Sequence, residues 1–268
     1  MIDMKEIVKD IEKKLNIRVN SYNNYKEGTT NSLVLSINNE YLIKTMEKDE
    51  ITIQQIFLDY YKDINYFQKI VYVNNNLEYI CFKYIKGEKL KNSNIKFNVI
   101  DEFYKITKSY KKYECNFYGY FDYKYETSSE FLESEILYAK NRLPNLDISK
   151  VNKAFLNLKK YKIDKYLLHG DLGMHNMLVN GNEIKVIDAM PLVFTPLYDF
   201  YFACLSNLSF VFPLDNLFDY YDEDLEYKKN LFIIVFYIKL SRIYVYDRKN
   251  YELYLNYYNE LEELLKII

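Results

Sequence analysis

The chain has 268 residues and a formal net charge of -2, with 36 basic side chains against 38 acidic ones. This length allows one large domain or two smaller ones, each with its own hydrophobic core. Lysine supplies nearly all of the positive charge, since the sequence has only four arginines. Nucleic-acid-binding proteins usually carry a basic excess and arginines for bidentate contacts, so the composition argues against a nucleic-acid partner.

The three cysteines, Cys81, Cys115 and Cys204, lie far apart and form no C-x-x-C pair. Such spacing indicates neither a zinc site nor a disulfide framework. The first residues are charged, and the longest apolar runs reach about half of the ~20 residues that a membrane span requires. The sequence therefore predicts a cytoplasmic protein without a membrane-spanning segment, and it leaves the oligomeric state open.

The first part of the chain mixes helical and strand patterns. Apolar residues recur at helical spacing over residues 3–15 and 51–61. Short β-prone runs flank Asn38-Asn39, a plausible two-residue hairpin turn because asparagine tolerates positive φ. These runs cover residues 33–37 and 41–45, and two further strands are expected at 70–73 and 78–84. The pattern predicts a small α+β lobe with antiparallel strands over residues 1–86.

Residues 87–268 are expected to form a second, mainly helical lobe. Thr127 and Glu130 have the spacing of a capping box, which predicts a helix running towards Lys140. Residues 151–161 are amphipathic, and residues 231–246 and 251–268 also have helical patterns. A tight hairpin is expected where residues 177–179 and 183–187 flank the turn Asn180-Gly181-Asn182.

Candidate chemistry lies in the stretch His169-Gly-Asp171-Leu-Gly-Met-His175-Asn176 and in Asp188, beyond the predicted hairpin. Asp171, Asn176 and Asp188 offer carboxylate and amide oxygens, which suit Mg²⁺ because this ion completes its shell with water and phosphate. Lys44, on a strand of the first lobe, could neutralise phosphate oxygens. Phosphoryl transfer depends mainly on positioning and charge stabilisation, so this set points to a kinase.

With these residues in view, the sequence resembles the aminoglycoside phosphotransferase and choline kinase family, whose fold is similar to that of protein kinases. The resemblance rests on His169-Gly-Asp-x4-Asn176, Ile187-Asp188 and Pro196-Leu-Tyr-Asp199, together with Lys44 and Phe82-Lys-Tyr-Ile-Lys-Gly87. It implies a two-lobed protein-kinase-like fold of the α+β class. It covers roughly residues 28 to 200, and the last ~60 residues match only in being helical.

The resemblance also implies roles for individual residues. Asp171 would be the catalytic carboxylate, Asn176 and Asp188 would hold Mg²⁺, and Asp199 would accept hydrogen bonds from the catalytic loop and from the helix after it. The nucleotide would be bound by Lys44, by the main chain from Lys83 to Ile85, and by the phosphate loop Gly28-Thr-Thr30-Asn-Ser32. Two residues are candidates for the partner of Lys44: Glu50, the nearest acid, and Gln54, to which the helical register points.

For His169, a buried histidine that braces the loop is the favoured interpretation over acid/base catalysis. The acidic stretch 215–226 has two interpretations: a solvated connection between helices, or a surface for a cationic substrate. The sequence thus predicts a small-molecule kinase that transfers the γ-phosphate of ATP or GTP to a hydroxyl of an amine-bearing substrate. An aminoglycoside-like antibiotic is favoured, since choline kinases tend to carry Asn where this chain has Gly170. The alternatives are a choline or ethanolamine kinase and a non-catalytic, kinase-fold nucleotide-binding protein.

Overall fold

The computed structural model describes residues 3–25, 33–90, 98–143, 145–212, 214 and 216–266. The chain divides into two compact units. The first comprises Met1–Asn92 and Met177–Asp188, and the second comprises Ser93–Asn176 and Ala189–Ile268. The hairpin that the sequence analysis placed in the C-terminal lobe is thus grouped with the N-terminal unit.

A five-stranded antiparallel sheet forms the centre of the first unit, in the order β1-β2-β3-β5-β4. Its strands are β1 (Tyr22–Tyr25), β2 (Val34–Ile37), β3 (Tyr41–Thr45), β4 (Ile70–Val73) and β5 (Tyr79–Lys83). Asn38 and Asn39 both have φ of 53°, which confirms the tight turn predicted between β2 and β3.

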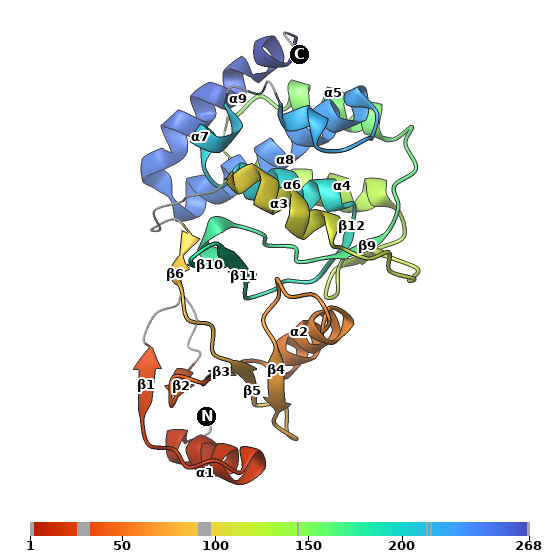
Figure 1. Cartoon of the computed structure of the whole chain (residues 1–268). Helices are drawn as coiled ribbons and strands as arrows, with labels where there is room; N and C mark the ends of the chain where they lie inside the picture. Colours follow the sequence, from red (N-terminus) through yellow and green to blue (C-terminus); the bar gives the residue numbers. More distant parts are fainter. Residues whose placement is uncertain are drawn as a thin grey trace. The chain divides into compact units, whose positions relative to one another are not determined.

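Helix α1 (Met4–Leu15) packs on one face of this sheet, as Figure 1 shows. Its buried residues Ile7 and Ile11 form a core cluster with strand residues that include Ile43 and Cys81. Side chains alternate between the two faces of a strand, so Lys44, the neighbour of Ile43, points to the face away from α1. That orientation leaves the lysine amine outside the apolar core beneath α1.

The first unit is completed by α2 (Lys48–Tyr60) and by a three-stranded sheet. This sheet has the order β11-β10-β6, with β6 at Glu88–Lys89, β10 at Met177–Asn180 and β11 at Glu183–Val186. Backbone hydrogen bonds join Val186 to the segment before β4: its N–H donates to Tyr66, and its carbonyl accepts from Gln68. The predicted hairpin is therefore present and is tied to the first unit.

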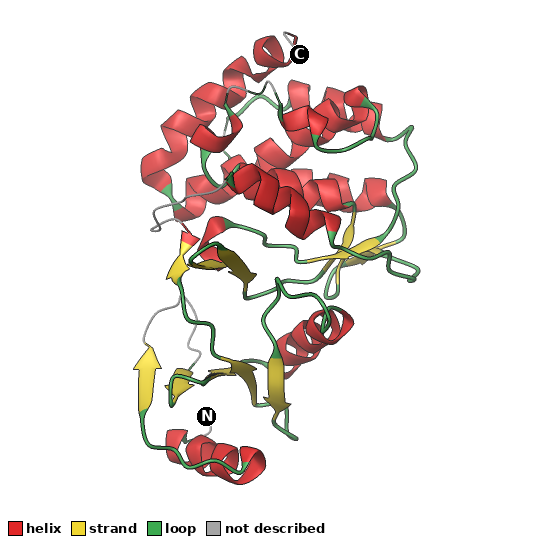
Figure 2. Ribbon diagram, in the orientation of Figure 1, coloured by secondary structure: helices red, strands yellow, loops and turns green. Residues whose placement is uncertain are grey.

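Helices make up most of the second unit (Figure 2). They are α3 (Val99–Lys108), α4 (Ser128–Arg142), α5 (Ser149–Leu158), α6 (Pro196–Cys204), α7 (Leu208–Val211), α8 (Leu225–Tyr246) and α9 (Tyr251–Lys266). Thr127 and Glu130 form both hydrogen bonds of a capping box at the start of α4, as predicted. No helix in the described part of the chain is both long and apolar enough to cross a membrane.

The second unit also contains a four-stranded sheet that the sequence analysis missed. It has the order β8-β7-β12-β9, with β7 at Tyr118–Tyr120, β8 at Lys124–Tyr125, β9 at Tyr166–Leu168 and β12 at Leu192–Phe194. Each strand has only two or three residues, too few to show a period of two. The strand β9 ends directly before His169 and so sets the starting point of the candidate loop.

The core of the first unit gives a direct test of the packing. Leu35 on β2 is fully buried, whereas Leu156 on α5 is 64% exposed. We expect Leu35→Ala to lower the free energy of unfolding by about 2–5 kcal/mol, because it removes buried apolar contacts and leaves a cavity. The matched variant Leu156→Ala should change it by less than about 0.5 kcal/mol. Urea unfolding followed by circular dichroism measures both, and equal effects would contradict the assigned core.

Candidate active site

The candidate loop begins with a buried histidine. His169 is 1% exposed, and its Nδ1 accepts a hydrogen bond of 3.3 Å from the backbone N–H of Asp171. Its carbonyl accepts a second bond, of 2.8 Å, from the N–H of Met190. These contacts confirm the prediction that His169 braces the loop.

Asp199, on α6, forms a hydrogen bond with the backbone of the loop. Its carboxylate is fully buried, and Oδ2 accepts hydrogen bonds from the Gly170 N–H at 3.0 Å and from the Tyr110 hydroxyl at 2.8 Å. Burial raises the pKa of Asp199 to about 6, although both hydrogen bonds oppose the shift. The bond from Gly170 confirms the structural role that the resemblance implied for Asp199.

Gly170 is required at its position for steric reasons. Its φ is +78°, and a Cβ there would lie 1.9 Å from the carbonyl oxygen of Met190. Only glycine combines this backbone conformation with so close an approach of another chain segment. The glycine of the motif therefore fixes the direction in which the next residue, Asp171, leaves the loop.

The carboxylate of Asp171 is contacted at both oxygens. Oδ2 accepts a hydrogen bond of 3.0 Å from Asn176 Nδ2 and lies 3.1 Å from His175 Nε2. Oδ1 accepts a hydrogen bond of 3.0 Å from the guanidinium of Arg242. Burial alone would raise the pKa of Asp171, but the contacts with His175 and Arg242 outweigh it and hold the pKa well below its usual range.

Two cations on α8 belong to this site and were given no role by the sequence. Arg242 contacts Asp171, and one turn earlier Lys239 donates to Ser206 Oγ at 3.2 Å, with its amine 3.9 Å from the centre of the Phe202 ring. Burial lowers the pKa of Lys239 to about 7, against the charge of Asp171. The sequence did contain a signal for them: Lys239 and Arg242 are the only charged residues in the otherwise mainly apolar helical pattern of residues 231–246.

In the first unit, Lys44 forms an ion pair with Asp188. Its amine lies 2.8 Å from Asp188 Oδ1, and the Asp188 side chain is 42% exposed. Asp188 has φ of 57°, a left-handed conformation that few residues other than glycine, asparagine and aspartate adopt. The structure thus brings together two predicted site residues that are far apart in sequence.

The two predicted partners of Lys44, Glu50 and Gln54, form no ion pair or hydrogen bond with it among the described residues. Glu50 is exposed in the first turn of α2, and among the described residues no ion pair or hydrogen bond links it to Lys44. Gln54 is 7% exposed, and within the same described residues it makes no hydrogen bond to Lys44. The predicted phosphate-loop residues Thr30 and Ser32 lie outside the described residues.

The predicted adenine-binding segment follows β5. The N–H of Lys83 donates to the Lys69 carbonyl at 2.9 Å, and that of Tyr84 donates to the Glu40 carbonyl at 2.8 Å. In the part of the chain that the structure describes, no backbone hydrogen bond engages Ile85. Of these three residues, Ile85 therefore has the main-chain groups best suited to pair with a base.

The predicted metal ligands have donor atoms that suit Mg²⁺. Asn176 Nδ2 donates to Asp171, at both its backbone carbonyl and its carboxylate, so the Oδ1 atom of Asn176 remains for a ligand. Asp188 has Lys44 on one oxygen and retains the other. Each of these oxygens is a donor of the type that Mg²⁺ accepts, because the ion completes its shell with water and phosphate. The described residues contain no group of three or more His, Cys, Asp or Glu placed to hold a metal.

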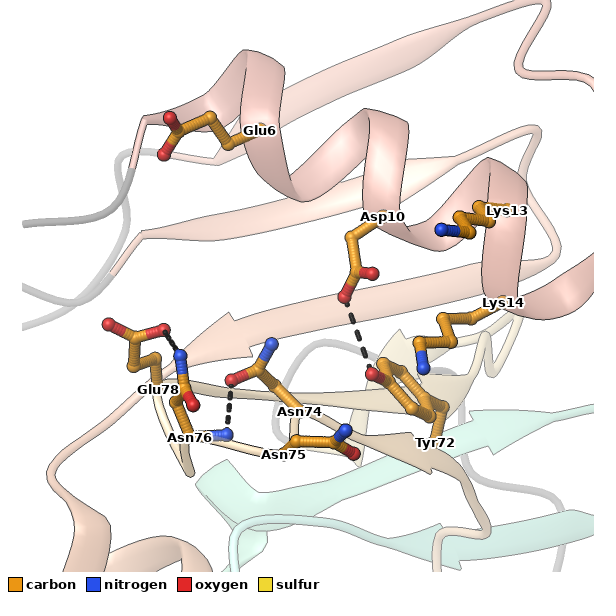
Figure 3. A pocket seen from close by; sticks show the side chains of 9 residues that line it. All are labelled: Glu6, Asp10, Lys13, Lys14, Tyr72, Asn74, Asn75, Asn76 and Glu78. Carbon is orange, nitrogen blue, oxygen red and sulfur yellow. Dashed lines mark hydrogen bonds between the residues drawn. The ribbon is translucent and has the colours of Figure 1, made fainter.

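A polar groove lies on the α1 side of the five-stranded sheet (Figure 3). It has a volume of about 690 Å³ and is lined by α1 and by the turn between β4 and β5. Asp10, within the groove, accepts hydrogen bonds from the hydroxyls of Tyr72 and Tyr79. Because this groove is on the α1 side and Lys44 points to the opposite face, it is separate from the predicted nucleotide site.

The acidic stretch 215–226 is partly engaged in local structure. Asp224 caps α8 by accepting the N–H of Tyr227 and also accepts the hydroxyl of Tyr161. Glu226 pairs with Lys160 at 3.0 Å. These contacts favour the interpretation as a connection between helices over a surface for a cationic substrate. Asp215 lies outside the described residues.

Comparisons with known proteins place the fold. No protein-family model matches the chain, and none of the curated proteins matches it. Solved structures do match over nearly their whole length. The choline kinase LicA from Streptococcus pneumoniae is similar at 16% identity with a TM-score of 0.60, covering 99% of both chains.

Two aminoglycoside phosphotransferases show the same similarity. The ADP-bound APH(2'')-Ib is 19% identical with a TM-score of 0.56, over 98% of this chain and 97% of that one. The gentamicin complex of APH(2'')-IIa is 19% identical with a TM-score of 0.58, over 97% of both chains. The chain therefore has the α+β kinase-like fold of these small-molecule kinases, as the sequence predicted.

The raised pKa of Asp199 predicts a pH dependence of stability. An acid whose pKa is higher in the folded than in the unfolded protein stabilises the fold most below about pH 4 and loses that contribution as the pH rises to about 6. We expect the free energy of unfolding of the wild type, relative to Asp199→Asn, to fall by on the order of 2 kcal/mol over this window. Urea unfolding at pH 4, 5, 6 and 7 measures the difference, and a constant value would contradict it.

Proposed function

We propose that the protein is a small-molecule kinase that transfers the γ-phosphate of ATP or GTP to a hydroxyl group of its substrate. The observation that carries this proposal is the partly buried Asp171 carboxylate, which is hydrogen-bonded to Asn176 and contacted at both oxygens. The Lys44–Asp188 pair in the first unit supports it. The ADP and gentamicin complexes of proteins with this fold give it a precedent.

Asp171 is proposed to act by orienting the acceptor hydroxyl. Its lowered pKa keeps it ionised at neutral pH, so it can accept a hydrogen bond from the hydroxyl. The same low pKa makes Asp171 a weak base. We infer that the hydroxyl proton passes to Asp171 mainly as the new O–P bond forms and the bond from the γ-phosphate to ADP or GDP breaks. This order of events suits a loose transition state, in which the attacking oxygen develops little bonding early on.

The nucleotide is proposed to use groups of the first unit. Lys44 would contact the α and β phosphates, Ile85 would pair with the base through its main chain, and Thr30 and Ser32 would cover the phosphates. Asn176 and Asp188 would hold Mg²⁺, which neutralises phosphate charge when bound. Lys44 and Asp188 form an ion pair, so nucleotide phosphates would compete for Lys44 and Mg²⁺ would compete for Asp188.

The acceptor is proposed to be a small molecule with a free hydroxyl, with an aminoglycoside-like compound and a choline-type amino alcohol as the first candidates. We propose a cytoplasmic location, where ATP and GTP are available. A coupled assay of ADP and GDP release over aminoglycosides, macrolides, choline, ethanolamine and simple sugars identifies the acceptor. The same screen, together with the titration below, separates a kinase from a protein that only binds nucleotides.

Nucleotide binding should depend on Mg²⁺. We expect isothermal titration with ATP and with GTP to show binding that is at least about tenfold tighter with Mg²⁺ than with EDTA for at least one of them. Asp188→Ala should abolish this difference, because it removes the carboxylate proposed to hold the ion. The matched control Asp164→Ala removes a surface carboxylate paired with Lys112 and should keep it. Equal affinity with and without Mg²⁺ in the wild type would overturn the kinase proposal.

Replacing the proposed catalytic carboxylate should separate binding from turnover. We expect Asp171→Asn to bind nucleotide with unchanged affinity and to lower turnover by about 100-fold or more, because an amide cannot accept the hydroxyl proton. Asp164→Asn is the matched control and should keep wild-type turnover. Turnover within a few-fold of the wild type in Asp171→Asn would show that another group orients the acceptor.

A further inference from the structure

Arg242 contacts the proposed catalytic carboxylate from a distant part of the chain. One terminal nitrogen donates to Asp171 Oδ1 at 3.0 Å, and the other donates to the Tyr120 hydroxyl at 3.4 Å. The guanidinium carbon lies 4.7 Å from the centre of the Phe202 ring. Three different elements, β7, α6 and α8, therefore fix this side chain beside the loop.

The two oxygens of Asp171 differ in how many donors they already accept. Oδ2 is contacted by Asn176 Nδ2 and by His175 Nε2, whereas Oδ1 is contacted by Arg242. A carboxylate oxygen accepts about two hydrogen bonds through its lone pairs. With Oδ2 engaged twice, Oδ1 is the oxygen with capacity for one more donor.

We propose that Arg242 is a positioning residue for phosphoryl transfer, which holds Asp171 so that Oδ1 receives the acceptor hydroxyl. This inference rests on the proposed function. Arg242 acts through Asp171. The guanidinium and the acceptor hydroxyl would both donate to Oδ1, so the guanidinium would limit the positions from which the hydroxyl can approach this oxygen. A charge-assisted bond suits this task because it is short and directional.

The position of Arg242 within α8 supports a role beyond folding. The buried residues of the helix end at Ser241, and the Arg242 side chain that follows is 25% exposed. An aliphatic residue would pack on Phe202 at least as well, because a buried ion pair contributes little net stability compared with apolar packing. An aliphatic residue has no hydrogen-bond donor, however, and so could not orient the Asp171 carboxylate.

Arg242→Met and Arg242→Lys test the proposal. We expect Arg242→Met to lower kcat by about 10- to 100-fold, the effect of a small misplacement of a reacting group, while KM for the nucleotide stays within about twofold. Arg242→Lys should recover part of kcat because its ammonium can reach Oδ1. Guanidinium chloride at low millimolar, non-denaturing concentration should increase kcat of Arg242→Met and leave Asp171→Asn unchanged.

The matched control is Arg248→Met. Arg248 stacks on the ring of Tyr244, 3.7 Å from its centre, and has no contact with Asp171. This variant should keep wild-type kcat. The proposal is overturned if Arg242→Met keeps kcat within about twofold of the wild type, or if neither lysine nor added guanidinium restores any of the loss.

A crystal structure of Arg242→Met separates failure of this inference from failure of the proposed function. We expect the Asp171 side chain to turn, so that Oδ1 leaves its position while the loop backbone is retained. An Asp171 carboxylate in its wild-type orientation would overturn the positioning role even if the wild type proved to be an active kinase. A displaced carboxylate in a protein without any transfer activity would support the positioning contact and overturn the kinase assignment instead.

Discussion

The hydrogen bond from the Gly170 N–H to the buried carboxylate of Asp199 is the contact on which the candidate active site depends. Burying a carboxylate without compensation is costly, and the raised pKa of Asp199 indicates that its hydrogen-bond donors offset the cost only in part. The Gly170 N–H thus compensates part of the burial of Asp199, and Asp199 in turn fixes the position of Gly170 against α6. Gly170 makes this possible, because a Cβ at its position would collide with Met190.

The residues proposed for phosphoryl transfer belong to both units. The first holds the Lys44–Asp188 ion pair, and the second holds Asp171 with its donors. The hairpin β10–β11 begins at the residue after Asn176 and ends two residues before Asp188, so the two proposed metal ligands flank one short element. A hairpin that is tied to the first unit by backbone hydrogen bonds therefore carries a proposed ligand at each end.

Features set by local sequence were predictable, and features set by tertiary contacts were not. The turn at Asn38-Asn39 and the capping box of α4 follow from the residues themselves, and the motif from His169 to Asn176 was recognised by its spacing. The four-stranded sheet of the second unit was missed, because strands of two or three residues are too short for a recognisable pattern. The contact of Arg242 with Asp171 could not be predicted either, because the two residues are 71 positions apart and sequence patterns relate only residues that are near each other in the chain.

The charges around Asp171 constrain the acceptor. Arg242 contacts the Asp171 carboxylate, and Lys239, one turn earlier on α8, is attracted by the same carboxylate. An acceptor hydroxyl that binds Oδ1 therefore lies beside the guanidinium. An ammonium group on the neighbouring carbon of that acceptor would be attracted by the Asp171 carboxylate and repelled by the Arg242 guanidinium, so its energy depends on which of the two it lies nearer. An aminoglycoside or amino alcohol of the kind proposed as acceptor would therefore place an amine favourably on the Asp171 side of the reacting hydroxyl and unfavourably on the α8 side, beside Arg242.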